Sequence, residues 1–212
     1  MARKSPARDY RTELFDYEPK FIDIQVARQD AQMSYVEAGP KDAEPVVLLH
    51  GNPTWSFLYR NIIPKLAEKR RVIAPDCLGM GRSDKLETRD DYSLTNHLDA
   101  LTQLMNKLEL EDVTLAVHDW AGPIGLSWAV DHPERLRRLV TGNQTNHTEE
   151  EDAQPQRERR VSVCDRERSC FNNLVCNRHY PPRLRANERT KTVGTPGYCR
   201  RRETPNHHCS VG

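Results

Sequence analysis

The sequence predicts an α/β fold, in which helices cover both faces of a mostly parallel β-sheet. Three short apolar runs at residues 45–50, 71–76 and 113–117 are rich in Val, Ile and Leu, which is typical of strands buried on both faces. Between the second and third runs, leucines recur at helical spacing. An order of strand, helix and strand indicates parallel strands joined by helical crossovers.

The first predicted elements are three strands and a helix. Residues 21–26 and 32–38 each alternate in the two-residue period of a half-buried strand, and the polar segment between them favours a hairpin. The buried strand at 45–50 follows. Ser56 is then the predicted N-cap of a helix. Its apolar positions are Phe57, Leu58, Ile62, Ile63 and Leu66.

The next elements continue the alternation. After the strand at 71–76, the glycine turn at 79–84 lacks a dinucleotide fingerprint or a P-loop lysine, so we interpret it as a tight loop and not as a phosphate site. An amphipathic helix is predicted over 93–107. A strand from Val113, a sharp turn and a second helix follow, and a further strand is predicted at 136–140.

Composition divides the chain into three parts: an N-terminal extension at 1–16, a partial α/β core at 17–141 and an atypical tail at 142–212. The tail contains no Ile, Met or Trp, only one Lys beside a dozen Arg, and five of the six Cys. Such a segment cannot bury enough apolar surface to offset chain entropy, so disorder is expected. Runs such as 161–164 and 173–176 are short and are flanked by charged residues, so they do not predict strands. An arbitrary reading frame after a frameshift would give the same composition.

The bulk composition excludes several classes of function. The net charge of +1 does not suggest a nucleic-acid partner, and the Arg clusters of the tail are interleaved with acidic residues. The N-terminus has no apolar stretch after its positive charges, and no long apolar span occurs, so we expect a cytoplasmic protein without a membrane partner. The cysteines are then expected to be free thiols. Their spacing fits a zinc site poorly, and no metal or other cofactor is expected.

The stretch from Val113 to Gly125 predicts the chemistry. Asp119 would lie at the carboxyl end of a central strand, on a turn flanked by small residues, where α/β proteins bind ligands. This is the arrangement of a nucleophile elbow, with Asp where esterases carry Ser. A single Asp at such a place is more often a helix cap, and Trp120 alone would more often be a core or rim aromatic.

The chain closely resembles the haloalkane dehalogenases of the α/β-hydrolase fold between about residues 17 and 140. The resemblance is carried by motifs in the family's order and spacing: residues 50–64 (HGNPTWSFLYRNIIP), Asp76 with Gly79, Gly81 and Ser83, and His118-Asp119-Trp120 with Gly122-Pro123-Ile124-Gly125. The related epoxide hydrolases share the His-Asp-Trp elbow but usually carry an aromatic residue at the position of Asn52, so they are the alternative. Ala121 departs from the glycine usual two residues after the nucleophile.

The resemblance implies a role for three residues. Asp119 would displace halide from carbon and form an ester, which water can cleave, whereas a serine would leave a stable ether. The side-chain N–H groups of Asn52 and Trp120 would receive the halide, and their backbone N–H groups would form the oxyanion hole. The implied partners are a small halogenated alkane and water. His50 and His118 are interpreted as structural residues beside the turns.

The catalytic acid and the histidine that activates water in the family cannot be located. His147, His179, His207 and His208 match no family motif. Two interpretations therefore stay open: a complete hydrolase whose base lies in the tail, and a truncated, non-catalytic fragment. We expect the chain as written to be inactive. A sheet stopped near Val140 would also expose an unpaired edge, which predicts poor solubility or chaperone dependence.

Overall fold

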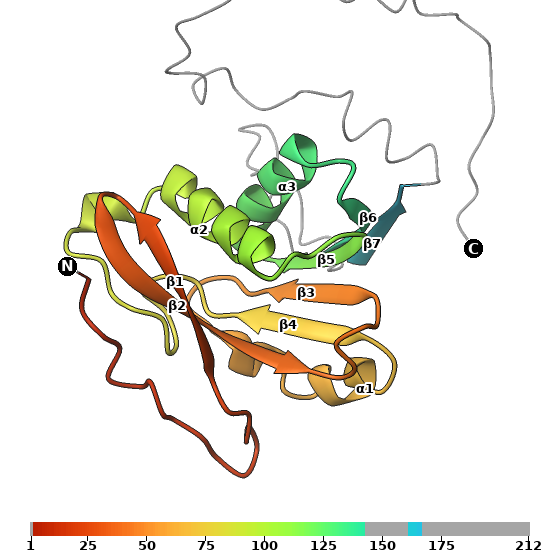
Figure 1. Ribbon diagram of the computed structural model, residues 1–212, viewed down its shortest axis with the longest axis horizontal. Helices are drawn as coiled ribbons and strands as arrows, with labels where there is room; N and C mark the ends of the chain where they lie inside the picture. Colours follow the sequence, from red (N-terminus) through yellow and green to blue (C-terminus); the bar gives the residue numbers. More distant parts are fainter. Residues whose placement is uncertain (1, 143–160, 167–212) are drawn as a thin grey trace, which may run out of the picture. The chain divides into compact units, whose positions relative to one another are not determined.

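A seven-stranded mixed sheet forms the centre of the computed structural model, which describes residues 2–142 and 161–166 (Figure 1). The strand order is β1-β2-β4-β3-β5-β6-β7. Strands β4, β3, β5 and β6 are parallel, while β1, β2 and β7 are joined by antiparallel pairing. The strands are β1 Lys20–Val26, β2 Gln29–Ala38, β3 Pro45–Leu49, β4 Arg71–Pro75, β5 Val113–His118, β6 Leu136–Gly142 and β7 Val161–Asp165. The predicted α/β class is confirmed, and the predicted parallel strands form the centre of a mixed sheet.

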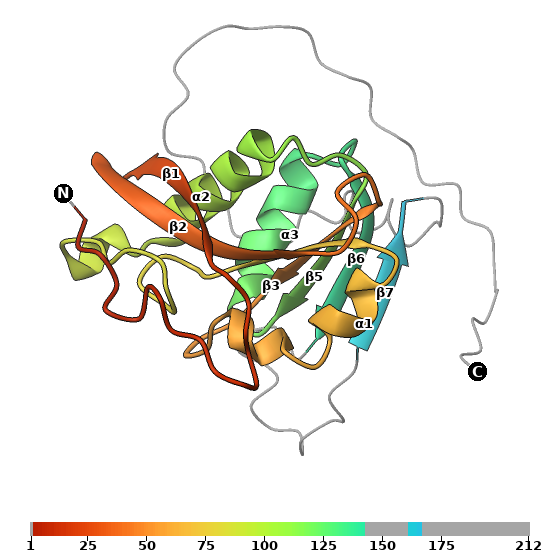
Figure 2. The ribbon, with the colours of Figure 1, turned by 60° about the horizontal axis from the view of Figure 1, so that its bottom comes forward.

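Helices lie on both faces of this sheet, which Figures 1 and 2 show from two directions. Helices α2 (Leu94–Lys107) and α3 (Ala121–Asp131) cover one face. On the other face lie α1 (Ile63–Ala67) and the 3-10 helix η1 (Ser56–Tyr59), and a second 3-10 turn, η2, spans Arg89–Asp91. Two apolar cores result: one joins the sheet to Leu101, Leu104, Ile124 and Trp128, and the other joins it to Tyr59 and Ile63. Strand β3 contributes alternate side chains to both cores, as its continuous apolar run predicts.

The helix predicted over 93–107 is confirmed, and its start shows why it forms there. Ser93 is extended and its hydroxyl accepts a hydrogen bond from the Asn96 backbone N–H at 3.1 Å, which satisfies one of the free donors of the first turn. In contrast, the single helix predicted from Ser56 to Leu66 is wrong. Pro64 lies in the first turn of α1, a position that needs no N–H, whereas a helix continuing through Pro64 would lose a hydrogen bond. The segment therefore forms η1 and α1 separately.

The predicted hairpin of β1 and β2 is confirmed, with a tighter turn than its polar residues suggested. Val26 pairs with Gln29, so that only Ala27 and Arg28 form the turn. Their φ angles are +50° and +59°. Positive φ at both central residues is characteristic of a type I′ turn, which favours Asn and Gly, so both native side chains occupy a disfavoured backbone region.

The double substitution Ala27→Asn with Arg28→Gly should therefore stabilise the chain by about 1 kcal/mol, because the turn conformation stays while its conformational cost falls. The midpoint of urea unfolding would report the gain. Ala43→Asn is a matched control outside the hairpin, at a residue without a positive φ, and should give no comparable gain. An unchanged or lowered midpoint for the double variant would contradict the turn assignment.

A seventh strand, β7, lies beside β6. The prediction that residues 161–164 do not form a strand is therefore wrong. Strand β7 pairs antiparallel with β6, and the register places Val163 opposite Val140. The guanidinium of Arg138 donates to the Asp165 carboxylate at 2.8 Å, and Arg166 donates to the Asp112 carboxylate at 2.7 Å. Two of the charges that argued against a strand thus form ion pairs, one with Arg138 of β6 and one with Asp112, the residue before β5. The expected unpaired edge at β6 is likewise wrong. The remainder of the predicted tail lies outside the described residues.

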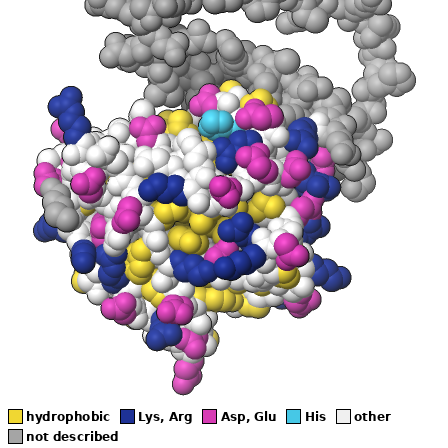
Figure 3. Space-filling view, in the orientation of Figure 1, with side chains coloured by type: hydrophobic (Ala, Val, Ile, Leu, Met, Phe, Trp, Pro, Cys, Tyr) yellow, Lys and Arg dark blue, Asp and Glu magenta, His cyan; other side chains and the backbone are white. Residues whose placement is uncertain are grey.

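The surface of the described part carries charges of both signs. Figure 3 shows Lys and Arg side chains interspersed with Asp and Glu, with hydrophobic side chains visible between them on the same face. Within residues 2–142 and 161–166, no helix is long and apolar enough to span a bilayer.

Candidate active site

Asp119 occupies the turn between β5 and α3, as the sequence predicts. Its φ of +55° lies in the left-handed region, which Asp tolerates better than most residues. The backbone holds the turn on both sides: the Asp119 N–H donates to the Gly142 carbonyl at 3.3 Å, and the Asp119 carbonyl accepts from the Gly122 N–H at 2.9 Å. A half-buried carboxylate is thereby presented at the carboxyl end of a central strand.

The sheet topology brings Asn52 to this carboxylate. Strands β3 and β5 are parallel neighbours with Leu49 opposite Val117, so the residues that follow both strands meet at one edge of the sheet. The Asn52 backbone N–H donates to Asp119 Oδ1 at 3.1 Å. The helix that follows β3 and the helix that follows β5 cover opposite faces, which makes this a topological switch point, where open α/β sheets bind ligands.

Gly51 is required for this approach. A Cβ atom at residue 51 would lie 2.4 Å from Asp119 Cβ and 2.8 Å from the His118 carbonyl oxygen, distances that real Cβ atoms do not reach. Gly125 plays a similar part where α3 packs against β5, because a Cβ atom added there would lie 2.4 Å from a Val117 methyl group. Ala121, which departs from the family pattern, is buried.

Gly51→Ala is therefore expected to lower the free energy of unfolding by about 2 to 3 kcal/mol, since backbone must move to admit the methyl group. It should also displace Asn52 from Asp119. Gly142→Ala is the matched control, because a Cβ there would meet its nearest atoms at 3.9 and 4.0 Å. Chemical denaturation of both variants would measure the difference. Equal stabilities would contradict the close packing of residue 51.

Trp120 is the N-cap residue of α3, and its side chain is 41% exposed. The Asn52 side chain is also exposed. The structure thus joins Asn52 to Asp119 through a hydrogen bond and places Trp120 beside Asp119 in the chain. The indole ring contacts the imidazole of His97, a residue of α2 that the sequence prediction did not single out. Its signal was present, because His97 falls on the leucine-bearing face of the helix.

His50 serves the turn structure, as interpreted from sequence. Its Nε2 accepts a hydrogen bond from the Cys77 backbone N–H at 2.9 Å, and its Nδ1 lies 2.8 Å from the Gly51 carbonyl oxygen. Because Nε2 accepts, Nδ1 carries the proton and donates. Burial lowers the pKa of His50, which keeps the imidazole neutral. Both nitrogens are therefore committed to backbone groups.

A buried carboxylate, Asp76, fixes the loop that contains Asn52 against the glycine turn. Asp76 Oδ1 accepts from the Ser56 N–H at 2.8 Å, and Oδ2 accepts from the Arg82 N–H at 2.9 Å. Both Asp76 and Arg82 are 0% exposed. The Arg82 guanidinium carbon lies 5.1 Å from the centres of the Phe15 and Trp55 rings. Asp76 belongs to the motifs that carry the family resemblance, but its neighbours in sequence predict no role for it.

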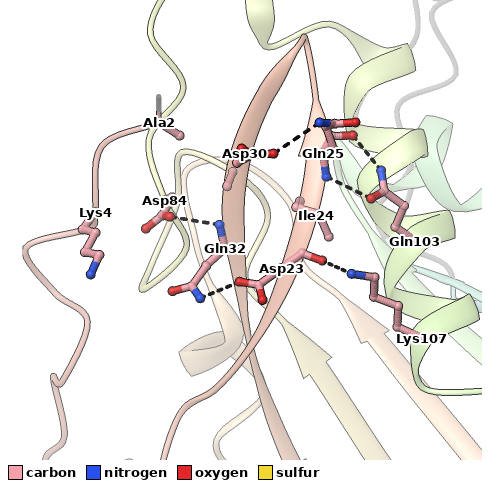
Figure 4. Close-up of a pocket in the computed structure, with 11 residues that line it drawn as sticks. Ala2, Lys4, Asp23, Ile24, Gln25, Asp30, Gln32, Asp84, Gln103 and Lys107 are labelled. Atoms are coloured by element: carbon pink, nitrogen blue, oxygen red, sulfur yellow. Dashed lines mark hydrogen bonds between the residues drawn. The ribbon is translucent and has the colours of Figure 1, made fainter.

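A hollow of about 500 Å³ lies elsewhere, between the β1–β2 hairpin, the N-terminal segment and α2 (Figure 4). Its polar lining groups largely bond one another: Gln103 pairs with the Gln25 backbone at 2.8 and 2.9 Å, and Gln32 donates to the Asp23 carboxylate. Asp119, Asn52 and Trp120 do not line it. We place the candidate site at Asp119, because this carboxylate lies on a strand-to-helix turn and accepts a hydrogen bond from the Asn52 backbone N–H.

The catalytic acid and base are not identified in the described part of the chain. His147, His179, His207 and His208 lie outside it. Within residues 2–142 and 161–166, no three His, Cys, Asp or Glu side chains gather in a way that could hold a metal ion.

Comparison with known proteins places this arrangement in a family. The model of the alpha/beta hydrolase fold matches residues 44–187. A haloalkane dehalogenase of Psychrobacter cryohalolentis is 40% identical over 131 residues, which are 61% of this chain and 43% of the relative. A cis-3-alkyl-4-alkyloxetan-2-one decarboxylase of Xanthomonas campestris is 42% identical over 136 residues, 61% of this chain and 44% of the relative. A solved haloalkane dehalogenase structure from Paraglaciecola agarilytica superposes with a TM-score of 0.64 at 35% identity, covering 74% of this chain and 52% of that one.

The chain belongs to the α/β-hydrolase fold family. Over part of its length it is similar to haloalkane dehalogenases in both sequence and structure, so the resemblance predicted from the motifs is confirmed. The chain spans a little under half the length of these curated relatives.

Proposed function

We propose that this chain is a haloalkane dehalogenase-like hydrolase that carries out the first half-reaction of such enzymes, with Asp119 as nucleophile. The observation that supports it most is the geometry of one residue: Asp119 is held at φ +55° on the strand-to-helix turn, with the Asn52 N–H 3.1 Å from Oδ1. A carboxylate oriented in this way by a backbone donor keeps its other oxygen available for attack. The similarity to haloalkane dehalogenases supports the substrate class, a small halogenated alkane.

In the first half-reaction, the free carboxylate oxygen of Asp119 attacks the carbon that bears the halogen. The carbon–halogen bond breaks, the halide leaves with the electron pair, and an alkyl ester remains on Asp119. The side-chain N–H groups of Trp120 and Asn52 receive the halide, which lowers the barrier because charge develops on the leaving atom.

The oxyanion hole serves the second half-reaction. In the ester, Oδ1 becomes the carbonyl oxygen, and the Asn52 N–H that already donates to it would stabilise the negative charge that forms when water adds. The backbone N–H of Trp120 is the second donor in this proposal. Both donors belong to backbone that the turns around Gly51 and Asp119 hold in place.

The water must be activated by a general base, and neither His50 nor His97 is suited to that role. His50 has both ring nitrogens engaged by backbone, and burial lowers the pKa of His97 to about 4, which makes it a weak base. We therefore propose that the chain forms the ester and hydrolyses it slowly or not at all, as a catalytically incomplete hydrolase.

Incubation of the purified full chain with 1-bromohexane tests this proposal. One equivalent of bromide released, with a mass gain of one hexyl group mapped to Asp119, is the expected result. Hydroxylamine distinguishes this ester from alkylated cysteine, because it cleaves esters and leaves thioethers intact. Release of many equivalents of bromide would identify a complete hydrolase. A chain that folds but gains no ester would support the non-catalytic fragment, and an ester formed from an epoxide but not from the bromoalkane would support the epoxide hydrolase alternative.

A second candidate function is decarboxylation of an oxetan-2-one. It is favoured by the Xanthomonas campestris decarboxylase, which is 42% identical over 136 residues. A cis-3,4-dialkyloxetan-2-one incubated with the chain would lose carbon dioxide and leave an alkene. Gas chromatography of the alkene separates this activity from dehalogenation, and its absence under conditions where the bromoalkane forms an ester would exclude it.

A further inference from the structure

His97 is a buried polar residue that the proposed chemistry does not use. Its side chain is 5% exposed and lies on the face of α2 that also buries Leu101, Leu104 and Met105. Placing an imidazole among leucines is costly unless it gains specific contacts. The contacts of His97 therefore indicate what it does.

The imidazole meets the indole of Trp120 edge to face. The two ring centres are 5.3 Å apart and the planes are inclined by 80°, which is the arrangement that aromatic pairs prefer over a stacked sandwich. His97 also lies near the Tyr92 ring, with ring centres 6.2 Å apart and planes inclined by 36°. His97 thus links an indole that is 41% exposed to residues of the protein interior.

The backbone of Trp120 is fixed by the turn, but the backbone does not fix the orientation of its ring. Trp120 adopts φ −62° and ψ −19° at the start of α3, and its side chain makes no cap hydrogen bond. An exposed indole can rotate about both of its side-chain bonds. A neighbouring ring whose centre lies 5.3 Å from that of the indole restricts this rotation, and the restriction comes from α2, an element separate from the turn at Asp119.

The contact is between neutral rings at neutral pH. Burial, with a smaller contribution from His50, lowers the pKa of His97 to about 4. The imidazole then carries no charge, and its contact with the indole depends on the geometry of the two rings.

We propose that His97 is a positioning residue, which holds the Trp120 indole in the orientation that lets its N–H receive the leaving halide. This inference rests on the halide-binding role of Trp120 proposed above. His97 does not contact the reacting atoms in this proposal; it acts through Trp120.

Fluorine NMR of the full chain labelled with 5-fluorotryptophan tests the inference directly. The chain has three Trp, so three resonances are expected, and Trp120→Phe identifies the one from residue 120. His97→Leu removes the aromatic edge while retaining an apolar side chain, and His97→Phe restores an edge. His132→Ala is the matched control, because the His132 ring contacts Trp128, with ring centres 5.1 Å apart.

Sodium bromide titration of the same labelled proteins measures halide binding. In His97→Leu, the Trp120 resonance should shift and broaden, and the dissociation constant for bromide should rise about three- to tenfold, as loss of an aromatic pair predicts. His97→Phe should keep the native value within about twofold. His132→Ala should alter the Trp128 resonance alone.

An unchanged Trp120 resonance in His97→Leu would overturn the inference, as would an unchanged bromide affinity in that variant when the native chain binds bromide. If His97→Leu does not fold, His97→Gln removes the ring in a polar form and is read in the same way. If bromide shifts no resonance of the native chain, the proposed halide site is wrong. The response of Trp120 to loss of the ring would then still decide whether His97 orients the indole.

Discussion

Asp119→Asn is expected to abolish ester formation with 1-bromohexane, with a loss of about 10⁴-fold or more in the alkylation rate. An amide oxygen is a far weaker nucleophile than a carboxylate oxygen, although its shape is nearly the same. Asn also tolerates the φ of +55° at this position, and its carbonyl can still accept from the Asn52 N–H. The fold should therefore be retained, and the loss can be assigned to chemistry.

Asp131→Asn serves as the control for this experiment. Asp131 is exposed and is the last residue of α3, the helix that follows the turn at Asp119. Intact-mass measurements over time should show ester accumulation in this variant at the native rate. Equal accumulation in Asp119→Asn would mean that another carboxylate is the nucleophile.

Asp76→Ala should produce the largest loss of stability among the single substitutions considered, about 3 to 5 kcal/mol. The carboxylate is 0% exposed, and it accepts from two backbone N–H groups, those of Ser56 and Arg82. Its removal would leave both donors unsatisfied and would leave the Arg82 guanidinium, 3.8 Å from Oδ2 and also 0% exposed, without its counter-charge.

Urea unfolding of Asp76→Ala and Asp42→Ala would measure this effect. Asp42 is exposed in the turn between β2 and β3, so its removal should change the free energy of unfolding by less than about 0.5 kcal/mol. Similar midpoints for the two variants would contradict the role of Asp76 in joining the two loops.

Local sequence patterns were sufficient to predict the elements that are buried on both faces or amphipathic. The runs that became β3, β4 and β5 are apolar throughout, and the helix from Leu94 to Lys107 carries leucines at a constant spacing with Ser93 before it. Asp119 could be located for the same reason, because the strand and helix on either side of it are both well marked. These features depend on residues close together in the chain.

Features that depend on distant residues could not be predicted. Strand β7 gains its hydrogen bonds from β6 and an ion pair from Arg138, so a window around Val163 contains little of what stabilises it. The hairpin turn at Ala27 and Arg28 has no Asn-Gly signal, because its conformation is imposed by the pairing of the two strands. His97 lies within the predicted helix but was not singled out, because its contact with Trp120 depends on how α2 packs beside α3.

The position of β5 within the sheet determines how thermal fluctuations reach Asp119. Sheets open from their edges, and fraying that begins at β7 must release β6 before it reaches β5. From the other direction, β1, β2, β4 and β3 separate β5 from the far edge. The antiparallel pairing of β7, residues 161–165, with β6 thus protects β5 from opening at this edge. We expect the amide protons of β7 to exchange with solvent before those of β5, whose backbone leads into Asp119.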